Sequence, residues 1–153
     1  MDKSIVCGVD GSPDSKSALR VAAELAERLG SRLVLAYVTD PVHRTYVGAA
    51  PYGGVAMASS LTVEELRKSQ QESAEDLLEQ IAREAGTPDA ERRVISGVPA
   101  EGLSDLADEV SAELIVVGSR GRGAFRAAFL GSVSYSLVGV ARCPVLVVPH
   151  GAT

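Results

Sequence analysis

The chain contains no tryptophan, and with four tyrosines and two phenylalanines it has few aromatic residues of any kind. Its core must therefore be built mainly from aliphatic side chains, which suits an α/β domain. Acidic residues outnumber basic ones: the chain has 20 Asp and Glu but 15 Lys and Arg, which gives a net charge of −5. General nucleic-acid binding needs a basic face, so this charge argues against it. At 153 residues we expect one domain, covering 1–153.

Long apolar runs are missing as well. No stretch approaches the roughly 20 residues that cross a bilayer. The apolar start at Ile5-Val6-Cys7 is too short for the apolar region of a signal peptide. The two cysteines, Cys7 and Cys143, lie far apart without metal-ligand spacing, so we expect buried, reduced thiols. Together these absences predict a cytoplasmic protein with no membrane association.

The usual groupings of catalytic residues are also missing. His43 and His150 have no companions, and we interpret both as exposed histidines without a role. The serines Ser12, Ser119 and Ser132 have no obvious general base. A nucleophile needs such a base, so we expect a protein that binds a ligand and turns it over slowly or not at all.

What the sequence does have is a regular alternation of apolar runs and amphipathic segments. The residues Ser12 and Thr62 fit helix starts, and Gly30 and Gly86 fit helix ends. Strands are predicted at 5–9, 33–38, 91–97, 114–117 and 145–148, and helices at 13–29, 63–85, 99–110 and 132–141. Segment 39–60 fits neither pattern and is interpreted as a long loop. This alternation predicts a single-domain, doubly wound α/β fold, with helices on both faces of a mainly parallel five-stranded sheet.

In such sheets ligands bind beyond the carboxyl ends of the strands, where the strand order switches. Three segments that are far apart in sequence follow or end predicted strands: Asp10-Gly11-Ser12, Val38-Thr39-Asp40 and 118–121. We expect them to converge on one crevice.

The stretch Gly118-Ser119-Arg120-Gly121, followed nine residues later by Gly131-Ser132, is the strongest functional signal. It joins a buried strand to a helix, and glycines allow a backbone to approach a ligand closely. The first amides of the next helix have no internal partners and favour an anion. The spacing is neither that of a P-loop, which needs a lysine, nor G-x-G-x-x-G. We interpret it as a phosphate-binding loop; the alternative is a plain flexible connection.

The spacing G-x2-G-x9-G-S resembles the nucleotide-binding signature of the universal stress protein family. The likeness extends over the whole chain and is carried by the stretches 5–12, 116–123, 130–134 and 143–149. It implies a strand order of 3-2-1-4-5, a stress-response role, frequent homodimers and, for members with this glycine pattern, ATP binding. The site residues that it implies are Gly8, Val9, Asp10, Val38, Gly118, Ser119, Arg120, Gly121, Arg122, Gly123, Gly131, Ser132 and Val133.

Several alternatives stay open. Asp10 is either a turn former before Gly11 or a group near the ribose or phosphates that acts through Mg²⁺. Gly8, Val9 and Val38 fit ordinary strand packing nearly as well as contacts with adenosine. The pocket could serve a nucleotide-binding regulator, a slow ATPase or phosphotransferase, or a cAMP site, and the chain could instead be a protein-interaction module. An uncovered apolar edge at 145–148 would favour a homodimer.

Overall fold

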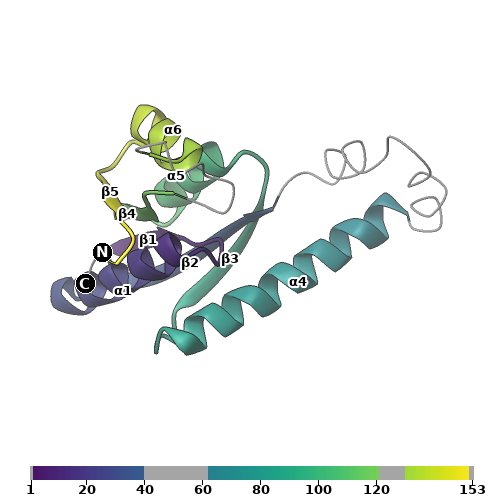
Figure 1. Ribbon diagram of the computed structural model, residues 1–153, viewed down its shortest axis with the longest axis horizontal. Coiled ribbons are helices and arrows are strands. Elements are labelled where there is room, and N and C mark those ends of the chain that lie inside the picture. The colour runs from purple at the N-terminus through teal and green to yellow at the C-terminus, as the bar shows by residue number, and fades with distance from the viewer. Residues whose placement is uncertain (1, 40–61, 121–129, 152–153) are drawn as a thin grey trace.

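The computed structural model describes residues 2–39, 62–120 and 130–151, arranged as Figure 1 shows. Helices and strands alternate along the chain as the sequence predicts. In chain order the elements are β1 (Ser4–Gly8), α1 (Pro13–Leu29), β2 (Arg32–Thr39), α4 (Val63–Glu84), β3 (Glu91–Ser96), α5 (Pro99–Glu109), β4 (Ala112–Gly118), α6 (Ser132–Val140) and β5 (Val145–Val148). The predicted loop lies outside the described residues from position 40 onward.

The five strands form one sheet in the order β3-β2-β1-β4-β5, and every neighbouring pair is parallel. This confirms the predicted sheet and its strand order. From β1 the chain moves outward through β2 to β3, and it then returns to the other side of β1 and moves outward through β4 to β5. The carboxyl ends of β1 and β4 therefore flank the point at which the order switches, where open α/β sheets hold their ligands.

Helices cover both faces of this sheet. The helices α1 and α4 lie on one face, and α5 and α6 lie on the other (Figure 1). Alternate residues of β1 supply the two cores: Ile5 and Cys7 pack toward α1 and α4, and Val6 packs toward α5 and α6. All three side chains are completely buried. A strand that is covered on both faces has no polar side to show, which explains its continuous apolar run.

The predicted helix ends are confirmed in atomic detail. The Ser12 hydroxyl accepts a hydrogen bond from the Ser15 amide at 3.2 Å and caps α1. Thr62 and Glu65 exchange the reciprocal bonds of a capping box at the start of α4. Gly30 and Gly86 have φ values of +65° and +71°, the left-handed conformation that glycine adopts without strain.

Three strands, β1, β2 and β4, begin earlier than predicted, because their first residues are small or polar and do not continue an apolar run; β1 starts at Ser4. β2 starts at Arg32, whose amide donates to the Lys3 carbonyl oxygen at 2.8 Å. β4 starts at Ala112, and the next residue, Glu113, forms an ion pair with Lys3 at 3.4 Å. Backbone pairing of Ser4 with Arg32 and with Ala112 extends all three strands beyond their apolar segments. Within the described part of the chain, no helix combines the length and apolarity needed to span a membrane.

The two cysteines differ in their environment, which leads to a prediction about reactivity. Cys7 is fully buried, and burial raises the pKa of its thiol to about 12; Cys143 is half-buried, and desolvation also raises its pKa. A raised pKa leaves less of the reactive thiolate at a given pH. At pH 8 we expect a thiol reagent to modify Cys143 slowly and Cys7 only after denaturation. Rapid labelling of a folded Cys143→Ser variant would contradict this.

Candidate functional site

The carboxyl edge of the sheet brings the predicted segments together. β1 ends at Gly8 and leads into Val9 and Asp10, while β2 carries Val38 near its end on one side and β4 ends at Gly118 on the other. The Val9 amide donates to the carbonyl oxygen of Ala36 at 2.9 Å, which continues the pairing of β1 with β2 past the end of β1. The described parts of these segments therefore meet at one edge of the sheet, while Asp40 and Gly121 lie outside the described residues and the predicted crevice stays a prediction.

Ser119, directly after β4, is the residue that joins the elements around this edge. Its amide donates to the carbonyl oxygen of Val148 on β5 at 2.8 Å. Its carbonyl oxygen accepts from the Gly131 amide at 2.6 Å and from the Ser134 hydroxyl at 3.1 Å, both at the start of α6. Its own hydroxyl donates to Oδ2 of Asp14 on α1 at 2.7 Å. One residue, 8% exposed, thus connects β5, α6 and α1.

These bonds hold the two ends of the glycine loop against each other. The predicted ligand contacts of Gly121, Arg122 and Gly123 lie outside the described residues and stay predictions. In the described part, the amides of Ser119 and Arg120 both donate to protein acceptors, Ser119 to Val148 and Arg120 to Asp14 Oδ2 at 3.0 Å. Among the described backbone amides, donors for an anion must therefore come from the start of α6.

The start of α6 differs from the starts of α1 and α4. Gly131 is its N-cap, and no side chain of the described residues caps it. The first α-helical hydrogen bond is the one from the Tyr135 amide to the Gly131 carbonyl oxygen. The amides of Ser132, Val133 and Ser134 therefore lack helical partners, and together with the exposed Ser132 side chain they form a set of donors at the carboxyl edge of the sheet.

Two of the predicted glycines have packing reasons of their own. A Cβ atom on Gly118 would lie 2.7 Å from the carbonyl carbon of Asp14 and 2.9 Å from its oxygen, so α1 approaches β4 only because this residue has no side chain. A Cβ atom on Gly8 would lie 3.0 Å from Leu103 Cδ1. Val9 is 5% exposed and belongs to the core on the side of α1 and α4. Packing accounts for the residue type at all three positions.

Asp10 forms the turn that leads into α1. Its Oδ1 accepts a hydrogen bond from the Ser12 amide at 2.9 Å, and its own amide donates to the Ser15 hydroxyl at 3.3 Å. This is the turn-forming role that the sequence left open. The described residues include no group of three or more His, Cys, Asp or Glu that could hold a metal ion. One carboxylate together with a nucleotide's phosphates is still a usual arrangement for Mg²⁺, so the predicted role of Asp10 stays a prediction.

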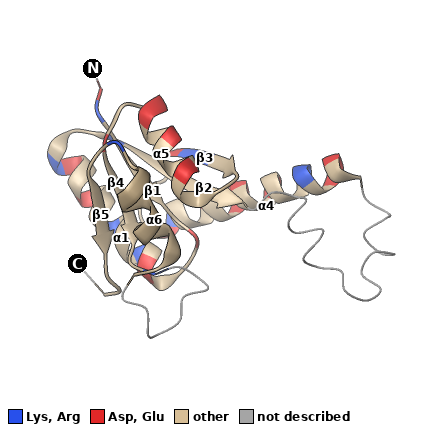
Figure 2. Ribbon diagram, turned by 90° about the horizontal axis from the view of Figure 1, so that it is seen from above, with Lys and Arg blue, Asp and Glu red and all other residues tan. Residues whose placement is uncertain are grey.

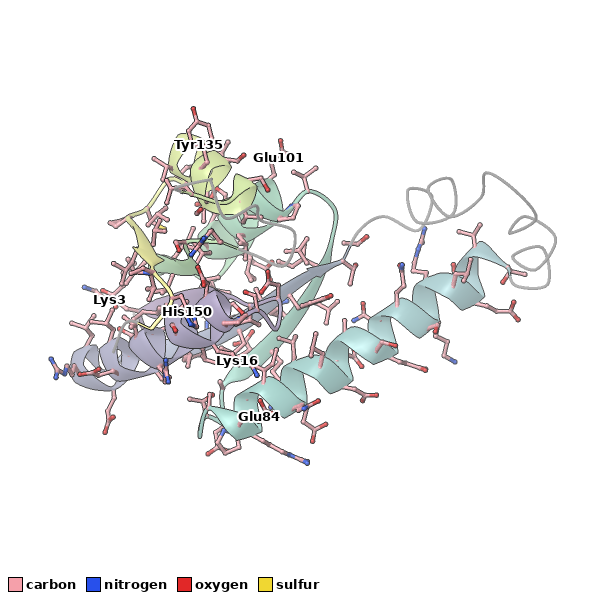
Figure 3. All side chains as sticks on the ribbon, viewed as in Figure 1. Lys3, Lys16, Glu84, Glu101, Tyr135 and His150 are labelled. Carbon is pink, nitrogen blue, oxygen red and sulfur yellow. The ribbon has the colours of Figure 1, made fainter. Side chains whose placement is uncertain are left out.

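Sequence reasoning missed Asp14 and its contact with His150. Asp14 lies in the first turn of α1, a place where an acidic residue is typical of any helix, so no signal marked it. His150 was interpreted as exposed and without a role. Its side chain is exposed, yet Nδ1 lies 3.7 Å from Asp14 Oδ1, and the residue lies beside α1 (Figure 3). A sequence separation of more than a hundred residues hid this contact.

The parallel sheet, its switch point and the loop held there define a doubly wound α/β protein with its candidate site at the strand ends. The model of the Universal stress protein family matches residues 1–149. A universal stress protein of Thermus aquaticus is 35% identical over 148 residues, which cover 97% of this chain and 99% of the relative. The chain belongs to the universal stress protein family.

Two solved structures of universal stress proteins resemble this fold and contain nucleotides. One is a complex with cAMP, 28% identical, with a TM-score of 0.61 and coverage of 98% of both chains. The other, from Archaeoglobus fulgidus, is a complex with dAMP, 25% identical, with a TM-score of 0.55 and coverage of 97% of this chain and 98% of that one.

The close approach at Gly118 can be tested by adding a single methyl group. We expect Gly118→Ala to lower the free energy of unfolding by about 1–3 kcal/mol, because its Cβ overlaps the backbone of Asp14. Gly139→Ala in α6 is the matched control: nothing lies within 4 Å of its added Cβ, so it should stabilise the protein by about 0.5–1 kcal/mol. Urea denaturation measures both. Equal stability of the two variants would contradict the packing role.

Proposed function

We propose that this protein is a stress-response regulator that binds an adenine nucleotide, ATP by the sequence signature, at the switch point of its sheet. The uncapped start of α6 carries the proposal. Three amides and the Ser132 hydroxyl face the edge where the loop ends are held together by Ser119. Orphan amides at a helix start, together with the helix dipole, stabilise a phosphate group.

The relatives support the choice of an adenine nucleotide. Two universal stress proteins with this fold hold cAMP or dAMP, each an adenine nucleotide with one phosphate, in their solved structures. In this chain, Val38 packs on the sheet face that carries α5 and α6, as does Val133 at the start of α6. An adenosine that lies near Val38 and directs its phosphates toward Ser132 would contact both Val38 and Val133. Mg²⁺ with Asp10 would complete the site for ATP.

A substitution at the helix start separates anion binding from folding. We expect Ser132→Asp to weaken ATP binding more than tenfold, because a carboxylate would occupy the position of the phosphate. The same charge favours the helix dipole, so the free energy of unfolding should be unchanged or higher by about 0.3–1 kcal/mol. Isothermal titration with ATP and Mg²⁺ gives the affinity, and urea denaturation gives the stability.

The control for this experiment is Ser69→Asp, the same change at an exposed position of α4. It should bind ATP like the wild type, which removes net charge as an explanation. Tight ATP binding by a folded Ser132→Asp variant would rule out the α6 start as the phosphate site. Competition between ATP and cAMP decides whether the site prefers ATP or a cyclic nucleotide. Release of phosphate no faster than the buffer blank would favour a regulator over a slow ATPase.

We also propose that the protein is a homodimer that pairs through β5. The two edges of the sheet differ: β3 begins with the charged residues Glu91, Arg92 and Arg93, whereas β5 consists of valine and leucine. Figure 2 shows acidic residues on α5, while α6 and β5 carry no charge. On α6, Tyr135 is 74% and Val138 64% exposed, and Tyr135 points away from the protein (Figure 3). An apolar edge next to an apolar helix face suits a second copy of the chain.

A charge on this helix face should break the dimer. We expect Val138→Arg to sediment as a monomer under conditions in which the wild type sediments as a dimer, because an interface disfavours an unpaired charge. Val63→Arg, at a similarly exposed valine at the start of α4, should leave the dimer intact. A dimeric Val138→Arg variant would exclude α6 from the interface, and a monomeric wild type would overturn the proposed dimer.

A further inference from the structure

Asp14 is a buried carboxylate whose two oxygens face different parts of the chain. The residue is 7% exposed. Oδ2 accepts hydrogen bonds from the Ser119 hydroxyl at 2.7 Å and the Arg120 amide at 3.0 Å, and it lies 3.8 Å from the Arg120 guanidinium. Oδ1 lies 3.7 Å from Nδ1 of His150. The carboxylate therefore stands between the first residues of the glycine loop and the segment that follows β5.

An acidic residue in the first turn of a helix is usually exposed and acts only on the helix dipole. Burying a carboxylate is costly unless hydrogen bonds and opposite charges compensate it. Here the compensation comes almost entirely from Ser119 and Arg120, and it depends on Gly118, whose missing side chain lets α1 approach. The burial of Asp14 is thus linked to one conformation of the chain directly after β4.

The segment after β5 is attached to the same helix. The Gly151 amide donates to the Ser17 hydroxyl at 3.2 Å, and Ser17 is 1% exposed. His150 faces Asp14 one turn earlier on α1. The segment from His150 to Gly151 therefore lies along α1 and ends its path beside the carboxylate that holds the loop.

We propose that Asp14 is a positioning residue of the nucleotide site, and that it couples the segment after β5 to the glycine loop; the first part rests on the proposed nucleotide binding. Through Oδ2 it fixes the direction in which the chain leaves β4, and it keeps the partly exposed guanidinium of Arg120 at the start of the loop. Because Oδ1 contacts His150, a displacement of His150 would move the carboxylate and with it Ser119 and Arg120. Asp14 touches neither phosphate nor base, so its effect on binding is indirect.

Two substitutions separate the hydrogen bonds of Asp14 from its charge. Asp14→Ala removes the acceptor, whereas Asp14→Asn retains one oxygen for Ser119 or Arg120 and removes the attraction to the guanidinium. Glu101→Gln is the control, because Glu101 is likewise an acid in the first turn of a helix, α5, but is exposed, and its loss changes the net charge equally. His150→Ala tests the coupling to the segment after β5.

The first measurement is hydrogen exchange in the nucleotide-free protein. We expect Asp14→Ala to speed exchange of the Arg120 amide about tenfold or more, Asp14→Asn to have a smaller effect, and His150→Ala to speed it measurably. Exchange of the Leu35 and Val116 amides, in the centre of the sheet, shows whether a variant is destabilised as a whole. Unchanged exchange at Arg120 in Asp14→Ala, or an equal rise in the central strands, would overturn the inference, and unchanged exchange in His150→Ala would overturn the coupling.

The second measurement is ATP affinity by titration calorimetry. We expect about tenfold weaker binding for Asp14→Ala, partial rescue in Asp14→Asn and wild-type binding in Glu101→Gln. If Asp14→Ala speeds the exchange of the Arg120 amide but binds ATP with wild-type affinity, Asp14 has only a structural role and the proposed positioning role is wrong. If wild-type protein binds no ATP, the proposed function fails, and the exchange of Arg120 in His150→Ala decides the coupling on its own.

Discussion

The hydrogen bonds of Ser119 are the constraint on which the rest of the site depends. Four bonds to three different elements fix this residue at the end of β4. A hydrogen bond contributes only about 1 kcal/mol net to stability, but a buried polar group that loses its partner costs more. We therefore expect the four bonds to form cooperatively. The loop between Ser119 and Gly131 therefore starts and ends at defined positions.

This junction exists because helix and strand come unusually close. Gly118 allows the backbone of Asp14 to lie against β4, and the same contact carries the Asp14 carboxylate over the next residue of the chain. The sheet topology places α1 beside β4, and the absence of a side chain at Gly118 determines how closely the helix approaches the strand. A glycine that sequence reasoning assigned to the ligand thus has a packing role that also shapes the site.

The fold could be predicted because its signals are local. Capping by Ser12 and Thr62, the stops at Gly30 and Gly86, and apolar runs for strands covered on both faces each follow from a few neighbouring residues. The contact between Asp14 and Ser119 joins positions 105 residues apart, and both residue types are ordinary where they stand. The starts of β1, β2 and β4 were misjudged because backbone pairing extends a strand through small or polar residues. The partners of Asp14 and Ser119 depend on tertiary packing, which no local pattern records.

The same strand takes part in both proposed activities. β5 is the apolar edge strand through which we propose that a second copy of the chain pairs, and its last residue, Val148, accepts the hydrogen bond of the Ser119 amide. An edge strand with a free side frays more easily than a central one, because only one neighbour holds it. Pairing two copies through β5 would give this strand a second neighbour and so hold the Val148 carbonyl oxygen in place. In the proposed dimer, the hydrogen bond between Ser119 and Val148 would therefore connect the candidate site to the pairing edge.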